Sequence, residues 1–130
     1  MPVFNPLHNL SALRTQLEHH QNLVIVCYCA QWCDTCKKYQ DDFERLADQY
    51  PQHAFVWIDI EDNPELLGDE DVENFPTLLI QDRQKNLFFG TLLPYISHLE
   101  RLIGQFENAD ADRAVQGPPL LRSLLAASTQ

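Results

Sequence analysis

Hydrophobic and polar positions follow two different periods along this chain, and these periods predict where helices and strands lie. Leucines recur every three or four residues after Asn5-Pro6, a pair typical of a helix start because asparagine caps and proline fits the first turn. Residues 36–50 repeat the helical spacing and are followed by proline. A third helix is predicted to open at Pro94, and its apolar face carries Ile96, Leu99, Ile103 and Phe106.

Continuous apolar runs predict four strands, over residues 23–28, 54–58, 77–80 and 87–89. Residues 82–86 form a polar turn, which predicts an antiparallel hairpin for the last two strands. Asn63-Pro64 repeats the signal for a helix start and predicts a short helix. The resulting order of elements predicts an α/β fold, a three-layer sandwich in which helices flank a central mixed sheet of about four strands.

The length of 130 residues and a hydrophobic content of 45% suit one domain with one core. We expect this domain to occupy residues 1–107 and an extension to occupy residues 108–130. Residues 107–119, which include Gly117-Pro118-Pro119, are predicted to be a loose connection. A short amphipathic tail helix is predicted from Leu120, Leu121, Leu124 and Leu125.

The net charge of −10 argues against nucleic acid and anionic membranes as partners, because both require a basic surface. No apolar run is long enough to span a membrane, and the first ten residues lack the features of an export signal, so we expect a cytoplasmic protein. Residues 59–73 contain eight acidic residues and no Lys or Arg. This run is either a solvated face or a surface that steers a basic partner.

All four cysteines of the chain fall between residues 27 and 36, which concentrates the candidate chemistry at one strand-to-helix junction. A thiol at Cys33 would face the unpaired N–H groups of a helix N-terminus, which stabilise a thiolate, and Lys37 adds positive charge. Cys36 follows within one helical turn and can reach it. Such a pair can form and open a disulfide, so the spacing predicts a redox site.

The residues from Trp32 to Lys37 resemble the W-C-x-x-C-K signature of the thioredoxin family. Phe75-Pro76-Thr77, before a predicted strand, is similar to the cis-proline loop of that family, and Gly90 resembles a glycine near the same surface. The resemblance covers residues 22–106. A CxxC motif alone is weak evidence, but in this context the combination is specific.

The resemblance implies a thiol–disulfide oxidoreductase that reduces protein disulfides in cell redox homeostasis. Cys33 would be the nucleophile and Cys36 the buried resolving thiol, with no cofactor or metal beyond the redox-active Cys33–Cys36 disulfide. Pro76 would be cis. Partners would be protein disulfides, basic ones if the acidic run steers them, and an electron-donating reductase. Substrate would contact Trp32, Phe75, Pro76, Thr77 and Gly90.

The chain departs from the family pattern at several positions expected to tune the active site. Cys27 stands where the family has a buried acid, and Trp57 stands where it has a lysine. Cys27 would be a poorer base than a carboxylate. Asp34-Thr35 replaces the usual Gly-Pro, and the Asp34 charge opposes a thiolate at Cys33. The first strand of the family fold is not evident in residues 1–6.

Three alternatives remain open from the sequence. Cys27 and Cys29 are two apart on a predicted strand and face the same side. They are either small buried hydrophobes, or a second redox pair, or a reserve thiol for Cys36. All four cysteines could instead bind zinc or an iron–sulfur cluster, although their spacing fits poorly. The third alternative is a binding module of the same fold that has lost its redox chemistry.

Overall fold

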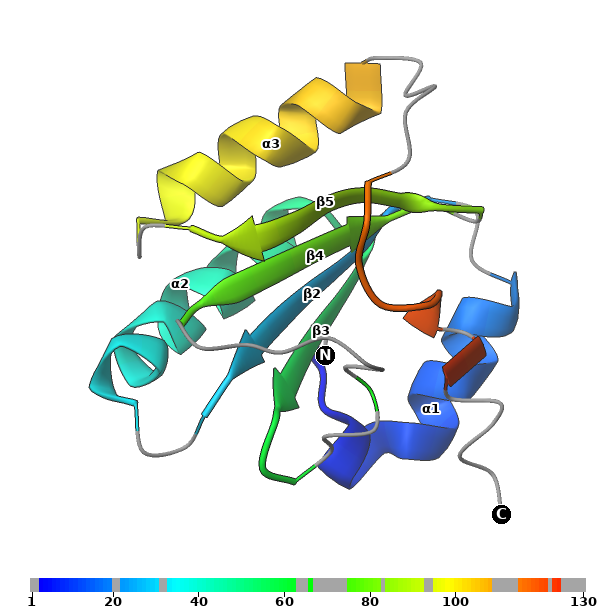
Figure 1. The fold of residues 1–130 in the computed structure, drawn as a ribbon, viewed down its shortest axis with the longest axis horizontal. Coiled ribbons are helices and arrows are strands. Elements are labelled where there is room, and N and C mark those ends of the chain that lie inside the picture. Colours follow the sequence, from blue (N-terminus) through cyan, green and yellow to red (C-terminus); the bar gives the residue numbers. More distant parts are fainter. Residues whose placement is uncertain are drawn as a thin grey trace.

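The computed structural model describes residues 3–19, 22–30, 33–62, 66, 75–82, 84–92, 95–108, 115–121 and 123–124. Within these ranges, five strands form one sheet in the order β1-β3-β2-β4-β5, and three helices accompany it (Figure 1). In chain order the elements are β1 (Val3–Phe4), α1 (Pro6–His19), β2 (Val24–Cys29), α2 (Asp34–Gln49), β3 (Ala54–Asp59), β4 (Thr77–Gln81), β5 (Asn86–Thr91) and α3 (Ile96–Asn108).

Helices cover both faces of the sheet, because the side chains of the central strand alternate between two apolar clusters. Ile25, Cys27 and Cys29 of β2 join the buried residues of α2 and α3 on one face. The intervening residues of β2 pack on the opposite face against buried leucines of α1. This arrangement confirms the predicted three-layer α/β sandwich.

The strand pairing confirms the predicted mixed sheet. β2 pairs parallel with β3 and antiparallel with β4, and β4 and β5 form the expected hairpin. The sheet has one strand more than the sequence predicted, because Val3–Phe4 pairs parallel with Phe55–Val56 of β3. A strand of two residues is too short to show any alternation of its own, and pairing with β3 is what holds it in an extended form.

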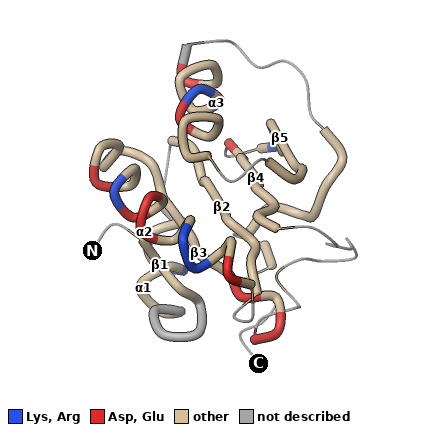
Figure 2. Tube along the Cα trace, turned by 90° about the vertical axis from the view of Figure 1, so that its left-hand side faces the viewer, with Lys and Arg blue, Asp and Glu red and all other residues tan. Residues whose placement is uncertain are grey.

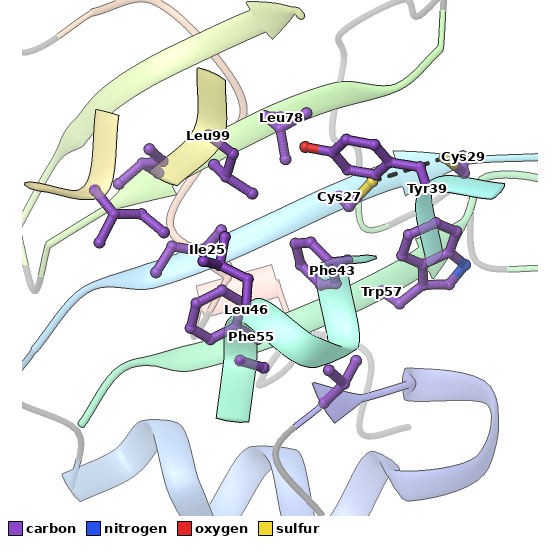
Figure 3. Close-up of a cluster of buried hydrophobic side chains, with 14 of the residues drawn as sticks. Ile25, Cys27, Cys29, Tyr39, Phe43, Leu46, Phe55, Trp57, Leu78 and Leu99 are labelled. Carbon is purple, nitrogen blue, oxygen red and sulfur yellow. Dashed lines mark hydrogen bonds between the residues drawn. The ribbon is translucent and has the colours of Figure 1, made fainter. Parts of the chain in front are cut away.

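The face that packs against α2 has an aromatic centre. The ring of Phe43, from α2, lies 5.4 Å from the ring of Phe55 and 5.6 Å from that of Trp57, both with edge-on geometry (Figure 3). Phe43 is fully buried, and burial of such a side chain contributes about 1.5–3 kcal/mol. This packing fixes α2, and therefore its first turn, against the end of the sheet where the cysteines lie.

The chain beyond α3 is tied to the sheet where the structure describes it. The Gln81 amide donates to the Pro119 carbonyl at 3.1 Å, and the Leu121 N–H donates to Gln81 at 3.0 Å. The expectation of a loose connection is therefore wrong for residues 115–119, since polar groups at the β4–β5 hairpin compensate for its lack of regular structure. Leu121 is buried against the α1 side of the sheet.

Several expectations fall at least partly outside the described residues. Only a helical turn of the predicted tail helix is described, with Leu124 N–H donating to the Leu120 carbonyl at 3.1 Å. The short helix at Asn63-Pro64 and most of the acidic run are not described. The boundary between a domain ending at 107 and an extension starting at 108 stays a prediction.

The described helices show two further features. None of them combines the length and the apolar composition that a membrane crossing requires. Basic and acidic residues interleave along α2 (Figure 2). The other face of this helix is buried in the core.

Candidate active site

Cys33 stands at the N-cap of α2, where the chain turns from the end of β2 into the helix. Its backbone is extended, and its N–H donates to the Ala30 carbonyl at 3.0 Å, which closes the turn. The Cys33 side chain makes no capping hydrogen bond and is partly exposed, so its sulfur is not engaged by the helix end. A half-exposed thiol beside the positive end of a helix dipole is placed for nucleophilic attack.

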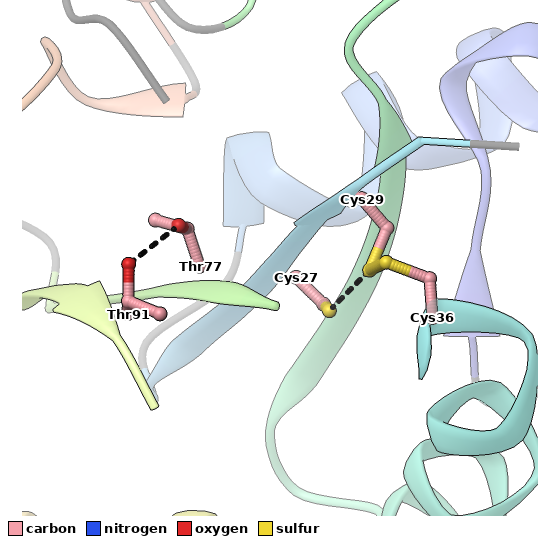
Figure 4. Close-up of a disulfide and its surroundings, with 5 residues drawn as sticks. All are labelled: Cys27, Cys29, Cys36, Thr77 and Thr91. Carbon is pink, nitrogen blue, oxygen red and sulfur yellow. Dashed lines mark hydrogen bonds between the residues drawn. A yellow bond between two sulfur atoms is a disulfide. The ribbon is translucent and has the colours of Figure 1, made fainter. Parts of the chain in front are cut away.

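Cys36 lies one turn further along α2, on the buried face of the helix, where only 2% of its surface is exposed. Its sulfur is bonded to Cys29, the last residue of β2, and the two Cα atoms lie 5.9 Å apart (Figure 4). Cys29 is as deeply buried as Cys36. The disulfide therefore joins the end of the central strand to the first turn of α2.

This pairing corrects the expectation of a Cys33–Cys36 disulfide for the state that the structure shows. Cys33 is a thiol here, and Cys36 is bonded to Cys29. The physical reason is geometric: Cys36 points from the helix toward the sheet, and Cys29 points from the sheet toward the helix. The view of Cys29 as a small buried hydrophobe is wrong, because its sulfur is a bonding partner.

Cys27 is fully buried on the same face of β2, and its sulfur lies 3.7 Å from the sulfur of Cys29. The two residues do face the same side of the strand, as the sequence predicted. Burial raises the pKa of the Cys27 thiol well above its ordinary value, because the apolar surroundings penalise the thiolate. Cys27 is therefore a protonated group that can donate a weak hydrogen bond to the neighbouring sulfur.

Trp57 of β3 is directly opposite Cys27 in the parallel register, so the thiol and the indole expected in place of the family's acid and lysine are neighbours. Both are buried, and the indole packs against Phe43. The hydroxyl of Tyr39, from α2, is also buried in this region and has no hydrogen-bond partner among the described residues. The environment under the cysteines is therefore apolar and holds no charged pair among these residues.

The loop before β4 completes the site. The Phe75–Pro76 peptide bond is cis, as predicted. The Pro76 carbonyl accepts a hydrogen bond of 3.2 Å from the Leu92 N–H, just beyond the end of β5, which fixes the loop to the edge hairpin. Phe75 is partly buried and packs on the same apolar cluster as Cys33. Both residues thus border the apolar layer that contains the disulfide.

Two more of the expected substrate contacts lie on the β4–β5 hairpin. The hydroxyls of Thr77 and Thr91 are 3.3 Å apart and directly opposite each other in the register. Gly90 pairs with Leu78, and a Cβ at Gly90 would meet Phe88 at an ordinary distance of 3.6 Å, so space alone does not require glycine there. Trp32, the remaining expected contact, lies outside the described residues.

The charged residues beside Cys33 are exposed. The Asp34 carboxylate lies 3.9 Å from the Lys37 ammonium, and both side chains are largely in solvent. The positive charge of Lys37 is therefore paired with the negative charge of Asp34. Each charge offsets the effect of the other on Cys33, and solvent weakens both effects. Thr35 occupies the first turn of the helix between the two cysteines.

Among the described residues, no group of three or more histidine, cysteine or acidic side chains is arranged to hold a metal ion. Two of the four sulfurs are bonded to each other. They cannot act as thiolate ligands at the same time, which removes the basis for a four-cysteine metal site in this state.

Comparison with known proteins identifies the family of this chain. A family model described as thioredoxin matches residues 6–90, well over half of the chain. This chain belongs to the thioredoxin family. Thioredoxin-3 of Saccharomyces cerevisiae, a mitochondrial protein, is 32% identical over 74 residues, which are 57% of this chain and 58% of that protein. A thioredoxin of Ophiophagus hannah is 30% identical over 70 residues, which are 53% and 67% of the two chains.

Solved thioredoxin structures share the fold. A poplar thioredoxin h superposes with a TM-score of 0.70 at 16% identity, covering 84% of this chain and 99% of that one. The Fasciola hepatica thioredoxin gives a TM-score of 0.65 at 24% identity, covering 81% and 98%. In sequence the matches cover less: three thioredoxin relatives are spanned over only 42% to 66% of their own length.

Reasoning from sequence named every cysteine but paired them differently from the structure. The alternation of β2 placed Cys29 on the face that α2 covers, and this was the signal for its contact with Cys36. What the sequence did not contain is the distance between a strand end and a helix turn, which depends on how α2 docks. The hydrogen bond from the Leu92 N–H to the Pro76 carbonyl had no sequence signal, because it joins two backbone groups.

Proposed function

We propose that this domain reduces disulfides in other proteins by thiol–disulfide exchange, with Cys33 as the attacking thiol and Cys36 as the resolving thiol. The observation that supports this most strongly is the placement of Cys33: a half-exposed, uncapped thiol at the N-terminus of α2, packed in the same cluster as the cis-proline loop of a thioredoxin fold. Cys36 lies buried one turn below it, which suits a thiol that acts only after substrate is attached.

The proposed reaction starts from the reduced protein. The Cys33 thiolate attacks one sulfur of a substrate disulfide, which forms a mixed disulfide and releases the other substrate sulfur as a thiolate. The Cys36 thiolate then attacks the Cys33 sulfur, releases the second substrate thiol and leaves a Cys33–Cys36 disulfide. Two electrons pass from the protein to the substrate, and a separate reductase must restore the dithiol.

The substrate backbone would approach along the loop at Phe75 and Pro76. In this family the loop presents an extended edge, and an extended substrate can pair with such an edge as an added strand. Phe75 supplies a partly buried apolar surface there, and the bond from Leu92 to Pro76 keeps the loop in position. These contacts recognise an extended chain near a disulfide and impose little sequence requirement.

Similar structures support the general kinds of partner. One is titled as a complex of ferredoxin:thioredoxin reductase with thioredoxin f2, and another concerns thiol resolution in a yeast mitochondrial 1-Cys peroxiredoxin by glutathione and thioredoxin systems. We infer that this chain likewise receives electrons from a reductase and passes them to proteins. A cytoplasmic location stays a prediction, since similar proteins include a mitochondrial one.

The acidic residues at the end of β3 support a preference for basic substrates. Asp59 pairs with Cys29 in the sheet register, and Glu61 and Asp62 are exposed just beyond it. We expect a basic disulfide peptide to react faster than an acidic one at low salt. The difference should shrink as salt rises, because exposed charges are screened beyond about 8 Å at physiological ionic strength.

The test is reduction of insulin by dithiothreitol, followed by turbidity, with the wild type and single cysteine variants. Cys33→Ser should reduce the catalysed rate to the background given by dithiothreitol alone. Cys36→Ser should retain attack and accumulate a mixed disulfide with a disulfide-containing substrate, visible on non-reducing gels. Lys38→Ser, an exposed change on the same helix, is the matched control and should behave as wild type.

A wild type that does not exceed the dithiothreitol background, yet still binds reduced and oxidised substrates, would refute the proposal. That result would leave the domain as a binding module of the thioredoxin fold. Equal activity of Cys33→Ser and wild type would refute the assignment of the nucleophile.

A further inference from the structure

The disulfide that the structure shows is sealed from solvent on both sides. Cys29 is 1% exposed and Cys36 is 2% exposed. Thiol–disulfide exchange requires the attacking thiolate to reach one of the two sulfurs directly. An external reductant therefore cannot open this bond without a rearrangement, so an internal thiol must act first.

Only one thiol of the chain is suited to that role. Of the four cysteines, two form the bond and Cys27 is fully buried with a raised pKa. Cys33 is partly exposed, packs on the same apolar cluster as both bonded cysteines, and is one helical turn from Cys36. It can therefore contact solvent or a substrate and also the buried disulfide.

We propose that Cys29 is a third redox-active cysteine, which competes with Cys33 for Cys36 and stores the oxidised state of the protein as a buried disulfide. The proposal rests on the proposed function, because substrate reduction is what generates the Cys33–Cys36 bond in the first place. Cys29 then converts that exposed disulfide into the buried one.

The conversion is an exchange within the protein and is balanced without any outside reactant. The Cys29 thiol gives up its proton and attacks the Cys36 sulfur. The Cys29–Cys36 bond forms, the Cys33–Cys36 bond breaks, and Cys33 leaves as a thiolate that takes up a proton. One disulfide is present before and after, so no electrons leave the protein, and the reverse step returns the disulfide to the surface for reduction.

Cys27 is placed to assist this exchange as a positioning residue. Its sulfur lies 3.7 Å from that of Cys29, and its buried position keeps it protonated. A protonated Cys27 can donate to the Cys29 sulfur when that sulfur carries negative charge, during its attack or its departure. Hydrogen bonds to charged groups are stronger than those to neutral ones, so the contribution is greatest at that moment.

The consequence is an oxidised protein with a free surface thiol. After one substrate has been reduced, Cys33 becomes available again while the two oxidising equivalents are held in the core. Reduction by a partner then depends on the share of molecules with the disulfide at the surface. Cys29 thus slows reduction of the oxidised protein by a partner.

The first experiment maps the disulfide in oxidised wild type and needs no substrate. Protein with one disulfide by mass is quenched with acid and then brought to about pH 8 in denaturant that already contains excess iodoacetamide, because iodoacetamide alkylates thiolates and not protonated thiols. The protein is then reduced and labelled with N-ethylmaleimide. All four cysteines lie on one tryptic peptide, residues 15–37, so fragmentation of that peptide assigns each label. We expect N-ethylmaleimide on Cys29 and Cys36 in most molecules. Its restriction to Cys33 and Cys36, with Cys29 always alkylated first, would overturn the proposal.

The second experiment measures how fast dithiothreitol reduces the native oxidised protein. Cys29→Ser should be reduced at least several-fold faster than wild type, since its disulfide can only be Cys33–Cys36. Cys33→Ser, oxidised to Cys29–Cys36, should be reduced at least tenfold more slowly, because the internal attacking thiol is missing. Equal rates for Cys33→Ser and wild type would show that the buried bond is opened directly and would overturn the proposal.

The role of Cys27 has its own control. In Cys27→Ala, reduction of the Cys29–Cys36 disulfide should be about tenfold slower than in the wild type. Cys27→Ser keeps a hydrogen-bond donor and should recover most of the rate. Equal slowing in both variants would assign Cys27 a packing role alone. Failure of insulin reduction would refute the proposed function, whereas the disulfide map and these rates decide the exchange independently of it.

Discussion

Replacing Cys27 with an acid, without a lysine in place of Trp57, should destabilise the fold in a pH-dependent way. The Cys27 side chain is fully buried, and its direct neighbours in the sheet register are Trp57 and Leu78. In Cys27→Asp a carboxyl group would have the Cys29 sulfur and the buried Tyr39 hydroxyl as polar neighbours, and none of these groups carries a positive charge. Even a neutral carboxyl would lose the hydrogen bonds that water gives it in the unfolded chain, and this loss costs about 1–3 kcal/mol.

Ionisation adds a second, larger cost. A buried carboxyl without a counter-charge has its pKa raised, by about 3–5 units in documented cases. Because the folded pKa lies above the unfolded value, the folded state binds more protons, and stability falls as pH rises through the window between the two values. From about pH 4 to pH 7 this amounts to about 4 kcal/mol, at 1.36 kcal/mol per unit.

The expected total at pH 7 is therefore about 5–7 kcal/mol, which approaches the whole stability of a typical domain of about 5–15 kcal/mol. Urea unfolding followed by circular dichroism between pH 4 and pH 7.5, in a reducing buffer, measures it. Cys27→Asn is the matched control, since it has similar size and no charge, and its deficit should not vary with pH. The double variant Cys27→Asp with Trp57→Lys should recover part of the loss at pH 7, because the opposite charge favours the ionised form. A deficit of Cys27→Asp that is independent of pH would refute this reasoning and the view of an apolar site.

Other substitutions give sharp contrasts in the free energy of unfolding. Tyr28→Phe should lower the free energy of unfolding by about 1 kcal/mol, because the Tyr28 hydroxyl donates at 3.0 Å to a buried carbonyl. Tyr39→Phe should leave it unchanged or raise it, because the Tyr39 hydroxyl has no described partner. Equal losses in the two variants would contradict this difference in hydrogen bonding. Gln81→Met should cost about 2–4 kcal/mol, since the Leu121 N–H and two further partners lose their bonds, and a cost below 1 kcal/mol would mean that water replaces them. Burial raises the pKa of Asp82. Hydrogen bonds from Lys85 and from two backbone N–H groups of the turn outweigh this effect, so the pKa lies below its ordinary value. The folded pKa is thus depressed, so the advantage of wild type over Asp82→Asn should be full at neutral pH and vanish as pH falls below about 4; a gap that persists at pH 2 would contradict it.

A partly buried polar cluster at the other end of β2 had no sequence signal at all. His53 accepts from the Leu23 N–H at 3.2 Å and shares a hydrogen bond of 2.6 Å with Glu107 of α3. Three segments distant in sequence meet there, and neither His53 nor Glu107 differs in its local sequence from an ordinary surface residue. Only the docking of α3 on the sheet creates an environment in which this histidine is buried.

The sequence by itself determined most of the described elements and the position of Cys33, the proposed nucleophile. Apolar runs and helical stripes are local patterns, because they reflect which face of each element is removed from water, and they located β2, β3 and β4 within a residue or two. Cys33 at a helix start and a cis bond before Pro76 follow from short motifs of the family, and both are present. These features depend on neighbours in the chain and are therefore readable from it.

The tertiary structure alone decided which groups meet. The pairing of Val3–Phe4 with β3 requires a strand already in place, since two residues have too few hydrogen bonds to be extended alone. The bond of Cys36 to Cys29, in place of Cys33, requires α2 to dock with its first turn over the end of β2. Three thiols lie within ten residues of Cys36 in the chain, and sequence separation cannot rank them, because a sulfur bonds the partner that packing brings within reach.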